Sequence, residues 1–285
     1  MNTKEKQNKL VKIENNNIYN MDCVKGMNLI SNNSIDLIIT DPPYGVDFSK
    51  GFDDSKENVE SNIGIWLEEM YRVLKEGSHC YIFIPSKEAG LWITKAQENF
   101  TLMNILSTKT HLTSTYLKNN FKFDNQLVLY LSKGKAKTFN KVDFIKTSDC
   151  WLKDKRNKNP KEYTYSYPSF LDIFSNEKST SKSKKENRHP CAKSISFIEI
   201  LIKLSSNENE VVLDPFAGGG STSLAALNTN RHFITFELSK DYYKTTKEKI
   251  NNKIKELDKI YFNIAKKDLI EQLNIFFSYN VSLKT

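Results

Sequence analysis

The chain has 285 residues, of which 39% are hydrophobic and 27% charged, and its formal net charge is +8. This composition supplies enough apolar bulk for a sizeable core and excludes a chain that is disordered throughout. Its longest apolar runs are far too short to span a bilayer, and its polar N-terminus lacks the apolar stretch of a signal peptide, so we expect no membrane insertion.

Four cysteines and four histidines are scattered along the chain. The cysteines form no Cys-x-x-Cys pair and the histidines show no metal-ligand spacing. We therefore expect reduced thiols, a cytoplasmic location and no metal site.

Strand-like and helix-like patterns alternate up to about residue 132. Residues 35–39 are a short branched apolar run that ends in a Pro-Pro turn, which is typical of a buried parallel strand. Residues 63–74 carry apolar side chains at helical spacing, and Gly77 is the expected C-terminal stop of that helix. Further strands are expected over residues 80–84, 102–107 and 126–131, with a helix over 89–99.

The alternation returns after residue 188. Strands alternating with helices predict a doubly wound α/β sheet, interrupted by one insertion. Helices are expected over residues 195–204, 221–227 and 240–257, and strands over 211–213 and 233–236.

The interval 133–188 between these halves holds fifteen Lys or Arg against seven Asp or Glu, so it carries the whole excess of positive charge. Eight aromatic residues are interleaved with these charges. The mixture favours contact with nucleic acid phosphates and bases, although a merely solvated face is the alternative. We expect phosphate contacts from Lys153, Lys155 and Arg156, and base contacts from Trp151 and Tyr165.

Asp41, Pro42, Pro43 and Tyr44 follow directly after the strand at 35–39. One interpretation is a turn that closes a strand. The other is a binding site, because a carboxylate at the carboxyl edge of a parallel sheet lies where such folds bind ligands. The two prolines fix the backbone and leave their carbonyls free as acceptors, and the tyrosine offers a face for stacking. Together they suit a planar base that bears an exocyclic amine.

Residues 211–221 run from a strand through a Gly-rich turn into a helix, which lets the backbone approach a ligand closely. Glu237 closes the next strand, at a distance from Asp214 that suits an acid holding ribose hydroxyls. A Gly-rich turn alone would also be compatible with a nicotinamide or flavin site. The pattern here is not Gly-x-Gly-x-x-Gly, however, and Asp214-Pro215-Phe216 precedes the glycines.

Together the two segments resemble the amino-methyltransferases that methylate DNA bases. Their order, with the Asp-Pro-Pro-Tyr segment first, a basic region next and the Gly-rich segment last, is similar to that of the β group of DNA adenine-N6 methyltransferases. The resemblance implies a mostly parallel seven-stranded sheet and S-adenosylmethionine as cofactor. It divides the chain into a catalytic half (1–132), a target-recognition insert (133–188), a cofactor half (189–260) and a C-terminal helical extension (261–285).

The resemblance also assigns residues. Asp41, Pro42, Pro43 and Tyr44 would be catalytic. Two departures weaken the pattern around the target base: Ser194 replaces a usual proline, and Ser107-Thr-Lys109 stands where Trp-x-Lys is frequent. Asp22 could equally be a helix cap, and His189 a helix-entry residue. The expected cofactor residues are Asp22, Cys23, Asp41, His189, Lys193, Asp214, Pro215, Phe216, Ala217, Gly218, Gly220, Ser221, Glu237 and Leu238.

The implied reaction moves a methyl group to the N6 amine of a flipped-out adenine, with Asp41 and the carbonyl of Pro42 accepting the amine hydrogens, and Tyr44 stacking on the base. The loop 46–62 is expected to close over that base, unless it has no function. A cytosine-N4 methyltransferase and a catalytically silent DNA-binding relative are the alternatives. Expected partners are double-stranded DNA, with single-stranded DNA as an alternative, and a cognate restriction endonuclease; the chain would be a monomer or homodimer.

Overall fold

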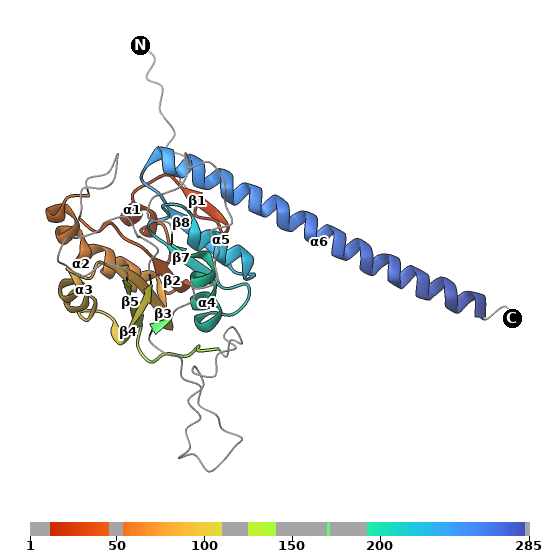
Figure 1. Cartoon of the computed structure of the whole chain (residues 1–285), viewed down its shortest axis with the longest axis horizontal. Coiled ribbons are helices and arrows are strands. Elements are labelled where there is room, and N and C mark those ends of the chain that lie inside the picture. The colour runs from red at the N-terminus through yellow and green to blue at the C-terminus, as the bar shows by residue number, and fades with distance from the viewer. Residues whose placement is uncertain (1–11, 46–53, 110–124, 141–169, 172–192, 283–285) are drawn as a thin grey trace, which may run out of the picture.

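A computed structural model of the chain describes residues 12–45, 54–109, 125–140, 170–171 and 193–282. The strands join in one sheet with the order β1-β8-β7-β2-β3-β5-β4-β6 (Figure 1). Most neighbouring pairs are parallel, whereas β5 runs antiparallel to both β3 and β4. The strands are β1 (Asn17–Tyr19), β2 (Ile35–Thr40), β3 (Leu74–Ile84), β4 (Thr101–Lys109), β5 (Asn125–Ser132), β6 (Phe170–Leu171), β7 (Val211–Asp214) and β8 (His232–Phe236).

The doubly wound, mostly parallel sheet that the sequence predicts is confirmed. The described residues form eight strands rather than seven, because the two-residue β6 pairs with the outer strand β4. Neither β6 nor the three-residue β1 was expected. Such short strands hold too few residues to show an alternating pattern, and only pairing with a neighbouring strand defines them.

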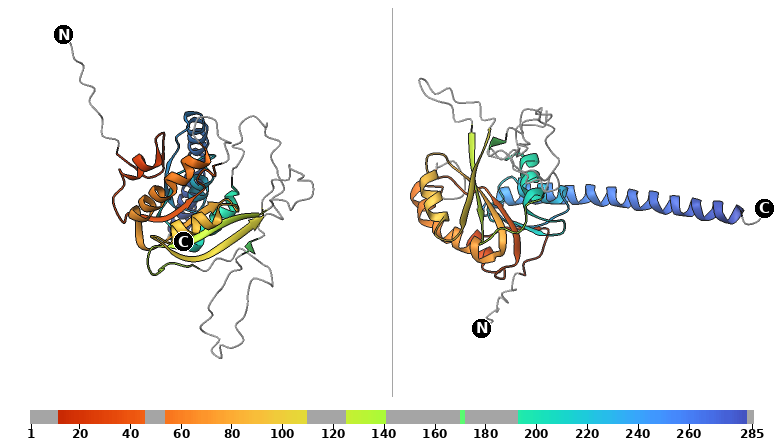
Figure 2. Two further views of the ribbon diagram at one scale, coloured as in Figure 1. Left: turned by 90° about the vertical axis from the view of Figure 1, so that its left-hand side faces the viewer. Right: turned by 90° about the horizontal axis from the view of Figure 1, so that it is seen from below.

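Helices cover both faces of the sheet (Figures 1 and 2). Every residue of β2 is buried, because its side chains point alternately into two apolar clusters. Ile38 belongs to the cluster under the first three helices, whereas Leu37 and Ile39 belong to the other. The helices on the first face are α1 (Cys23–Met27), α2 (Lys56–Val73) and α3 (Ala89–Ala96), and those on the second are α4 (Ile195–Ser205), α5 (Ser221–Asn228) and the start of α6 (Lys240–Ser282).

Helix α6 is much longer than the expected helix at 240–257. Ile250 is buried in the core, and the hydroxyl of Tyr261 donates a hydrogen bond to Asn230 at 2.8 Å. Beyond these contacts α6 extends away from the body as a straight rod (Figures 1 and 2). None of the helices in the described part of the chain combines the length and the apolar character needed to cross a membrane.

Two local expectations are wrong. Helix α2 ends at Val73, and the chain enters β3 at once, so Gly77 does not stop the helix. Gly77 lies within β3 with φ +84°, where a Cβ atom would meet the side chain of Lys137 at 2.5 Å. The expected loop at 46–62 is also too long. Residues 56–62 form the first turns of α2, because the Ser55 hydroxyl accepts the Asn58 N–H and caps the helix; residues 46–53 are outside the described part.

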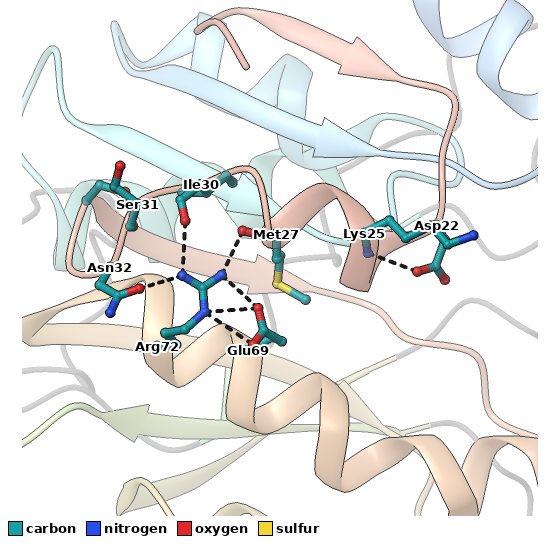
Figure 3. A network of polar contacts seen from close by, with 9 residues as sticks. Asp22, Lys25, Met27, Ile30, Ser31, Asn32, Glu69 and Arg72 are labelled. Carbon is teal, nitrogen blue, oxygen red and sulfur yellow. Dashed lines mark hydrogen bonds and ion pairs between the residues drawn. The ribbon is translucent and has the colours of Figure 1, made fainter. Parts of the chain in front are cut away.

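Arg72 of α2 anchors the segment that joins α1 to β2 (Figure 3). Its guanidinium donates to the carbonyl oxygens of Met27 and Ile30 and to the side chain of Asn32, while Glu69 pairs with it. These contacts fix the C-terminal end of α1, whose N-terminal end carries Asp22.

The first residues of the expected basic insert pack on the body. Lys133 is only 7% exposed, and its ammonium donates to the carbonyl oxygens of Tyr71 and Leu74 and to Asn33. The carbonyl of Thr138 pairs with the ring of His79. Lys133 therefore stabilises the fold rather than facing a ligand.

Candidate active site

The candidate site lies where the carboxyl ends of β2, β7 and β8 meet. The hydroxyl of Thr40, the last residue of β2, donates to the Asp214 carboxylate at the end of β7, at 2.8 Å. This buried bond sets the two predicted segments side by side although 174 residues separate them. A cavity of about 320 Å³ opens there, and both segments line it.

The Gly-rich turn forms one side of the cavity. Asp214 is 4% exposed and also accepts the backbone N–H of Phe216 at 3.0 Å, which starts the turn. Gly218 and Gly220 have φ of +46° and +80°, a region that favours glycine, and Gly220 precedes the first turn of α5. The turn therefore brings backbone amides to the cavity wall.

Glu237 faces this turn from the end of β8. Its two carboxylate oxygens accept the backbone N–H groups of Gly218 at 2.9 Å and Ser239 at 2.8 Å. Burial raises the pKa of Glu237 to about 7 against the opposing effect of these hydrogen bonds. Burial likewise raises the pKa of Asp214 to about 6, against the bond from Thr40.

These groups fit a polar, adenosine-bearing cofactor. The Glu237 carboxylate has further lone pairs for ribose hydroxyls, and the amides at the start of α5 suit polar groups. Phe216 packs edge-on against Trp66, with ring centroids 4.9 Å apart, and both rings line the cavity. A flat ring system can lie against such an aromatic wall.

Asp41 also lines the cavity and is held by side chains. The Tyr44 hydroxyl donates to Oδ1 of Asp41 at 2.6 Å, and the Lys193 ammonium pairs with Oδ2 at 2.9 Å. Lys193 also lies 5.3 Å from the centre of the Tyr44 ring and 5.4 Å from that of Phe83. The Tyr44 hydroxyl thus holds Asp41, in addition to the stacking role that the sequence predicts for the ring.

The Asp-Pro-Pro-Tyr turn is held in place by the residue that follows it. Gly45, which follows it, has φ +71°, and its N–H donates to Asp54 at 2.8 Å. Pro42 is buried, whereas Asp41, Pro43 and Tyr44 are partly exposed toward the cavity. The turn therefore presents the carboxylate from a rigid backbone.

Most of the predicted residues meet at this cavity. Asp22 lines it and also caps α1, where it accepts the N–H of Lys25, so the helix-cap interpretation is correct. Cys23 lines it too, but burial raises its pKa to about 12, so it is no nucleophile. Gly220 is not in the cavity wall, but its positive φ allows the turn that other wall residues form. The other predicted residues in the cavity wall are Asp41, Pro42, Pro43, Tyr44, Lys193, Asp214, Pro215, Phe216, Ala217, Gly218, Ser221, Glu237 and Leu238.

The remaining predicted residues lie outside the described part of the chain: His189, Lys153, Lys155, Arg156, Trp151 and Tyr165.

Several wall residues were not predicted. Thr40 could have been found, since it precedes Asp41 on the same strand. Gln126 is not in the cavity wall and belongs to no motif; its side chain meets Tyr44 and Lys193 only because β5 lies beside β3. The other unpredicted wall residues are Met21, Asp54, Trp66, Phe83, Ile198, Gly219, Thr222, Phe236, Ser239 and Tyr242.

A family model described as DNA methylase matches residues 35–248, most of the chain. This chain belongs to the DNA methylase family. The family expected from the two motifs is confirmed, as are a DNA methyltransferase activity, DNA as substrate and S-adenosylmethionine as methyl donor.

Relatives of this DNA methylase cover most of its length. The type II methyltransferase M.HpaI of Haemophilus parainfluenzae is 30% identical over 245 residues, 84% of this chain and 75% of the relative. The DNA adenine methyltransferase YhdJ of Escherichia coli is 28% identical over 238 residues, 80% of each chain. The structure of the M1.HpyAVI–SAM complex, 25% identical, matches with a TM-score of 0.55 over 81% of this chain and 98% of that one.

Proposed function

We propose that this DNA methylase transfers the methyl group of S-adenosylmethionine to the N6 amine of adenine. The observation that carries the proposal is one cavity whose wall contains both the Asp41 carboxylate and the Gly218–Glu237 pair. The aspartate that opens the first motif favours adenine over cytosine, and the relative YhdJ is named an adenine methyltransferase.

The chemistry required of the residues follows from the target atom. The N6 lone pair of adenine is delocalised into the ring, so the amine is a poor nucleophile. S-adenosylmethionine would supply a methyl group on a sulfonium, which an amine can attack directly: the N–CH3 bond forms as the S–CH3 bond breaks, the sulfur leaves as a neutral thioether, and the nitrogen releases one proton to solvent. Asp41 accepts one amine hydrogen and the Pro42 carbonyl accepts the other, which drives N6 toward tetrahedral geometry and aims its lone pair. Alignment of the amine contributes most of the rate.

The target base reaches Asp41 only after it leaves the duplex. Extrusion costs a few kcal/mol, which contacts in the pocket must offset. The ring of Tyr44 lies on the rigid turn beside Asp41 and supplies a stacking face for the extruded base.

A direct test measures the modified nucleoside. The protein is incubated with DNA and S-adenosylmethionine that carries a deuterated methyl group, and the DNA is digested for mass spectrometry. We expect deuterated N6-methyladenine. Deuterated N4-methylcytosine would reject adenine as the target, and the absence of any methylated base would indicate a catalytically silent DNA-binding relative. Sequencing the modified positions defines the recognition site.

The basic insert is our proposed DNA-binding region. Replacing Lys153, Lys155 and Arg156 by Ala should weaken binding to all sequences and lower the slope of log K against log salt by about 0.9 for each phosphate that is no longer neutralised. Replacing Trp151 or Tyr165 should instead weaken binding to the recognition site more than to random DNA. An unchanged salt slope in the charge variant would mean that the insert is a solvated face.

We further propose that the protein acts in the cytoplasm on double-stranded DNA, as a monomer or homodimer, beside a cognate restriction endonuclease. The type II methyltransferases among the relatives support this setting. Light scattering with and without DNA measures the oligomeric state. Cleavage of unmodified DNA by an extract of the source cells, blocked by prior methylation with this protein, would identify the endonuclease.

A further inference from the structure

Gln126 lies beside the catalytic turn and belongs to neither motif. It stands at the start of β5, opposite Thr108 of β4. Its Nε2 donates to the carbonyl of Ile84 at 2.8 Å, at the end of β3. This bond orients the amide, because the oxygen must then point the other way, toward the active site.

The oxygen of Gln126 meets the two side chains that hold Asp41. Oε1 lies 3.3 Å from the ammonium of Lys193 and 3.3 Å from the hydroxyl of Tyr44. The Tyr44 hydroxyl has one proton, and its bond to Asp41 at 2.6 Å is much the shorter. The Gln126 oxygen is therefore available as an acceptor for Lys193.

Lys193 thus has three acceptors, the Asp41 carboxylate at 2.9 Å, the Gln126 amide at 3.3 Å and the Tyr44 hydroxyl at 3.3 Å. Its side chain is only 17% exposed, so water offers little substitute for a missing partner. An amine that binds Asp41 must displace one of the donors now on that carboxylate. Tyr44 or Lys193 has to yield, and Lys193 keeps the Gln126 amide and the Tyr44 hydroxyl as acceptors when it leaves Asp41.

We propose that Gln126 is a positioning residue for methyl transfer, which receives the Lys193 ammonium when the amine of the target base binds Asp41. The inference rests on the proposed role of Asp41 in that reaction. Gln126 touches neither base nor cofactor in this role; the described residues in the cavity wall include Tyr44 and Lys193 but not Gln126.

The test is a double-mutant cycle with Gln126→Met and Lys193→Met, in which methionine keeps the approximate length without the hydrogen bonds. Single-turnover rates are measured on DNA with the recognition site, and S-adenosylmethionine binding is measured by calorimetry. In the wild-type background, Gln126→Met should lower the rate by roughly ten- to a hundred-fold, because Lys193 loses one of the two acceptors that it has besides Asp41. In the Lys193→Met background the same change should cost less than about threefold.

A matched control is Asn125→Ala, which alters the adjacent, exposed residue of β5 and should leave the rate unchanged. Cofactor affinity should stay within about threefold of wild type in Gln126→Met, since the Gly-rich turn is untouched, and this binding also verifies folding. Equal losses from Gln126→Met in both backgrounds would overturn the inference alone, because they would indicate a purely structural role. An inactive wild type would overturn the proposed function and, with it, the inference.

Discussion

Two parts of the cavity wall hold their carboxylates by opposite means, and we call them the rigid, Gly-rich end (the turn at 214–221 with Glu237) and the exchangeable end (Asp41 with Tyr44 and Lys193). At the Gly-rich end, Glu237 accepts two backbone N–H groups and the buried Asp214 accepts a backbone N–H and a threonine hydroxyl. At the other end, Asp41 is only partly buried and is held by the movable side chains of Tyr44 and Lys193. The difference separates a rigid end, which is formed by the fold, from an end whose contacts can be exchanged during a reaction.

The largest expected effect breaks the exchangeable end alone. Asp41→Ala should lower the rate of methyl transfer by about a thousand-fold or more, since the acceptor for the amine hydrogen is removed. Cofactor affinity should change little, because the rigid end carries it. Methylation assays and calorimetry measure the two quantities, with the exposed Asp258→Ala on α6 as the control. Substantial activity in Asp41→Ala would reject the mechanism.

The buried carboxylate of the rigid end should make the free energy of unfolding depend on pH. Burial raises the pKa of Glu237 from its ordinary 4.5 to about 7, so the folded protein retains a proton that the unfolded chain has released between these values. Its contribution to the free energy of unfolding therefore falls as pH rises through that window, by up to about 3 kcal/mol. The free energies of unfolding of wild type and Glu237→Gln are compared at pH 5 and pH 8. Relative to the variant, wild type should be less stable at pH 8 than at pH 5. A pH-independent difference would contradict it.

A glycine pair tests the backbone of the rigid end. Gly220→Ala should destabilise the protein by about 1 to 3 kcal/mol, because φ is +80° and the new Cβ would lie 2.6 Å from Thr246. Gly64→Ala is the matched change in α2, where nothing lies within 4 Å of the new Cβ, and it should stabilise by roughly 0.5 to 1 kcal/mol. Thermal unfolding compares them, and equal effects would show that the turn is not constrained.

The smallest effect divides the two roles of Tyr44. Tyr44→Phe keeps the stacking face but removes the hydroxyl bond to Asp41, so activity should fall by about tenfold while the affinity for DNA is kept. Tyr44→Ala removes the ring as well as the hydroxyl and should abolish activity. Steady-state kinetics separate the two variants, and equal activity in them would refute stacking as a role of the ring.

A different division explains what the sequence could predict. Segments whose functional residues follow one another along the chain, such as Asp41 to Tyr44 and the turn at 214–221, carry recognisable spacing and lie at the cavity as expected. Gln126 acts only through neighbours that the sheet supplies, so no local pattern marks it. The expectation for Gly77 was wrong for a related reason. A glycine near the end of a helix usually stops it, but here β3 begins before Gly77, and the missing side chain leaves room for Lys137. The three-residue β1 follows from pairing with β8 and not from its own composition.

The bond between Thr40 and Asp214 has a consequence for the time at which activity arises. It joins residues 174 positions apart, and closing so long a loop delays the formation of such contacts during folding. A growing chain on the ribosome holds Asp41 long before residue 214 exists, so the site cannot assemble until the segment with residue 214 has been synthesised. Activity therefore reports on completed folding, and a chain truncated before β7 would be expected to methylate nothing.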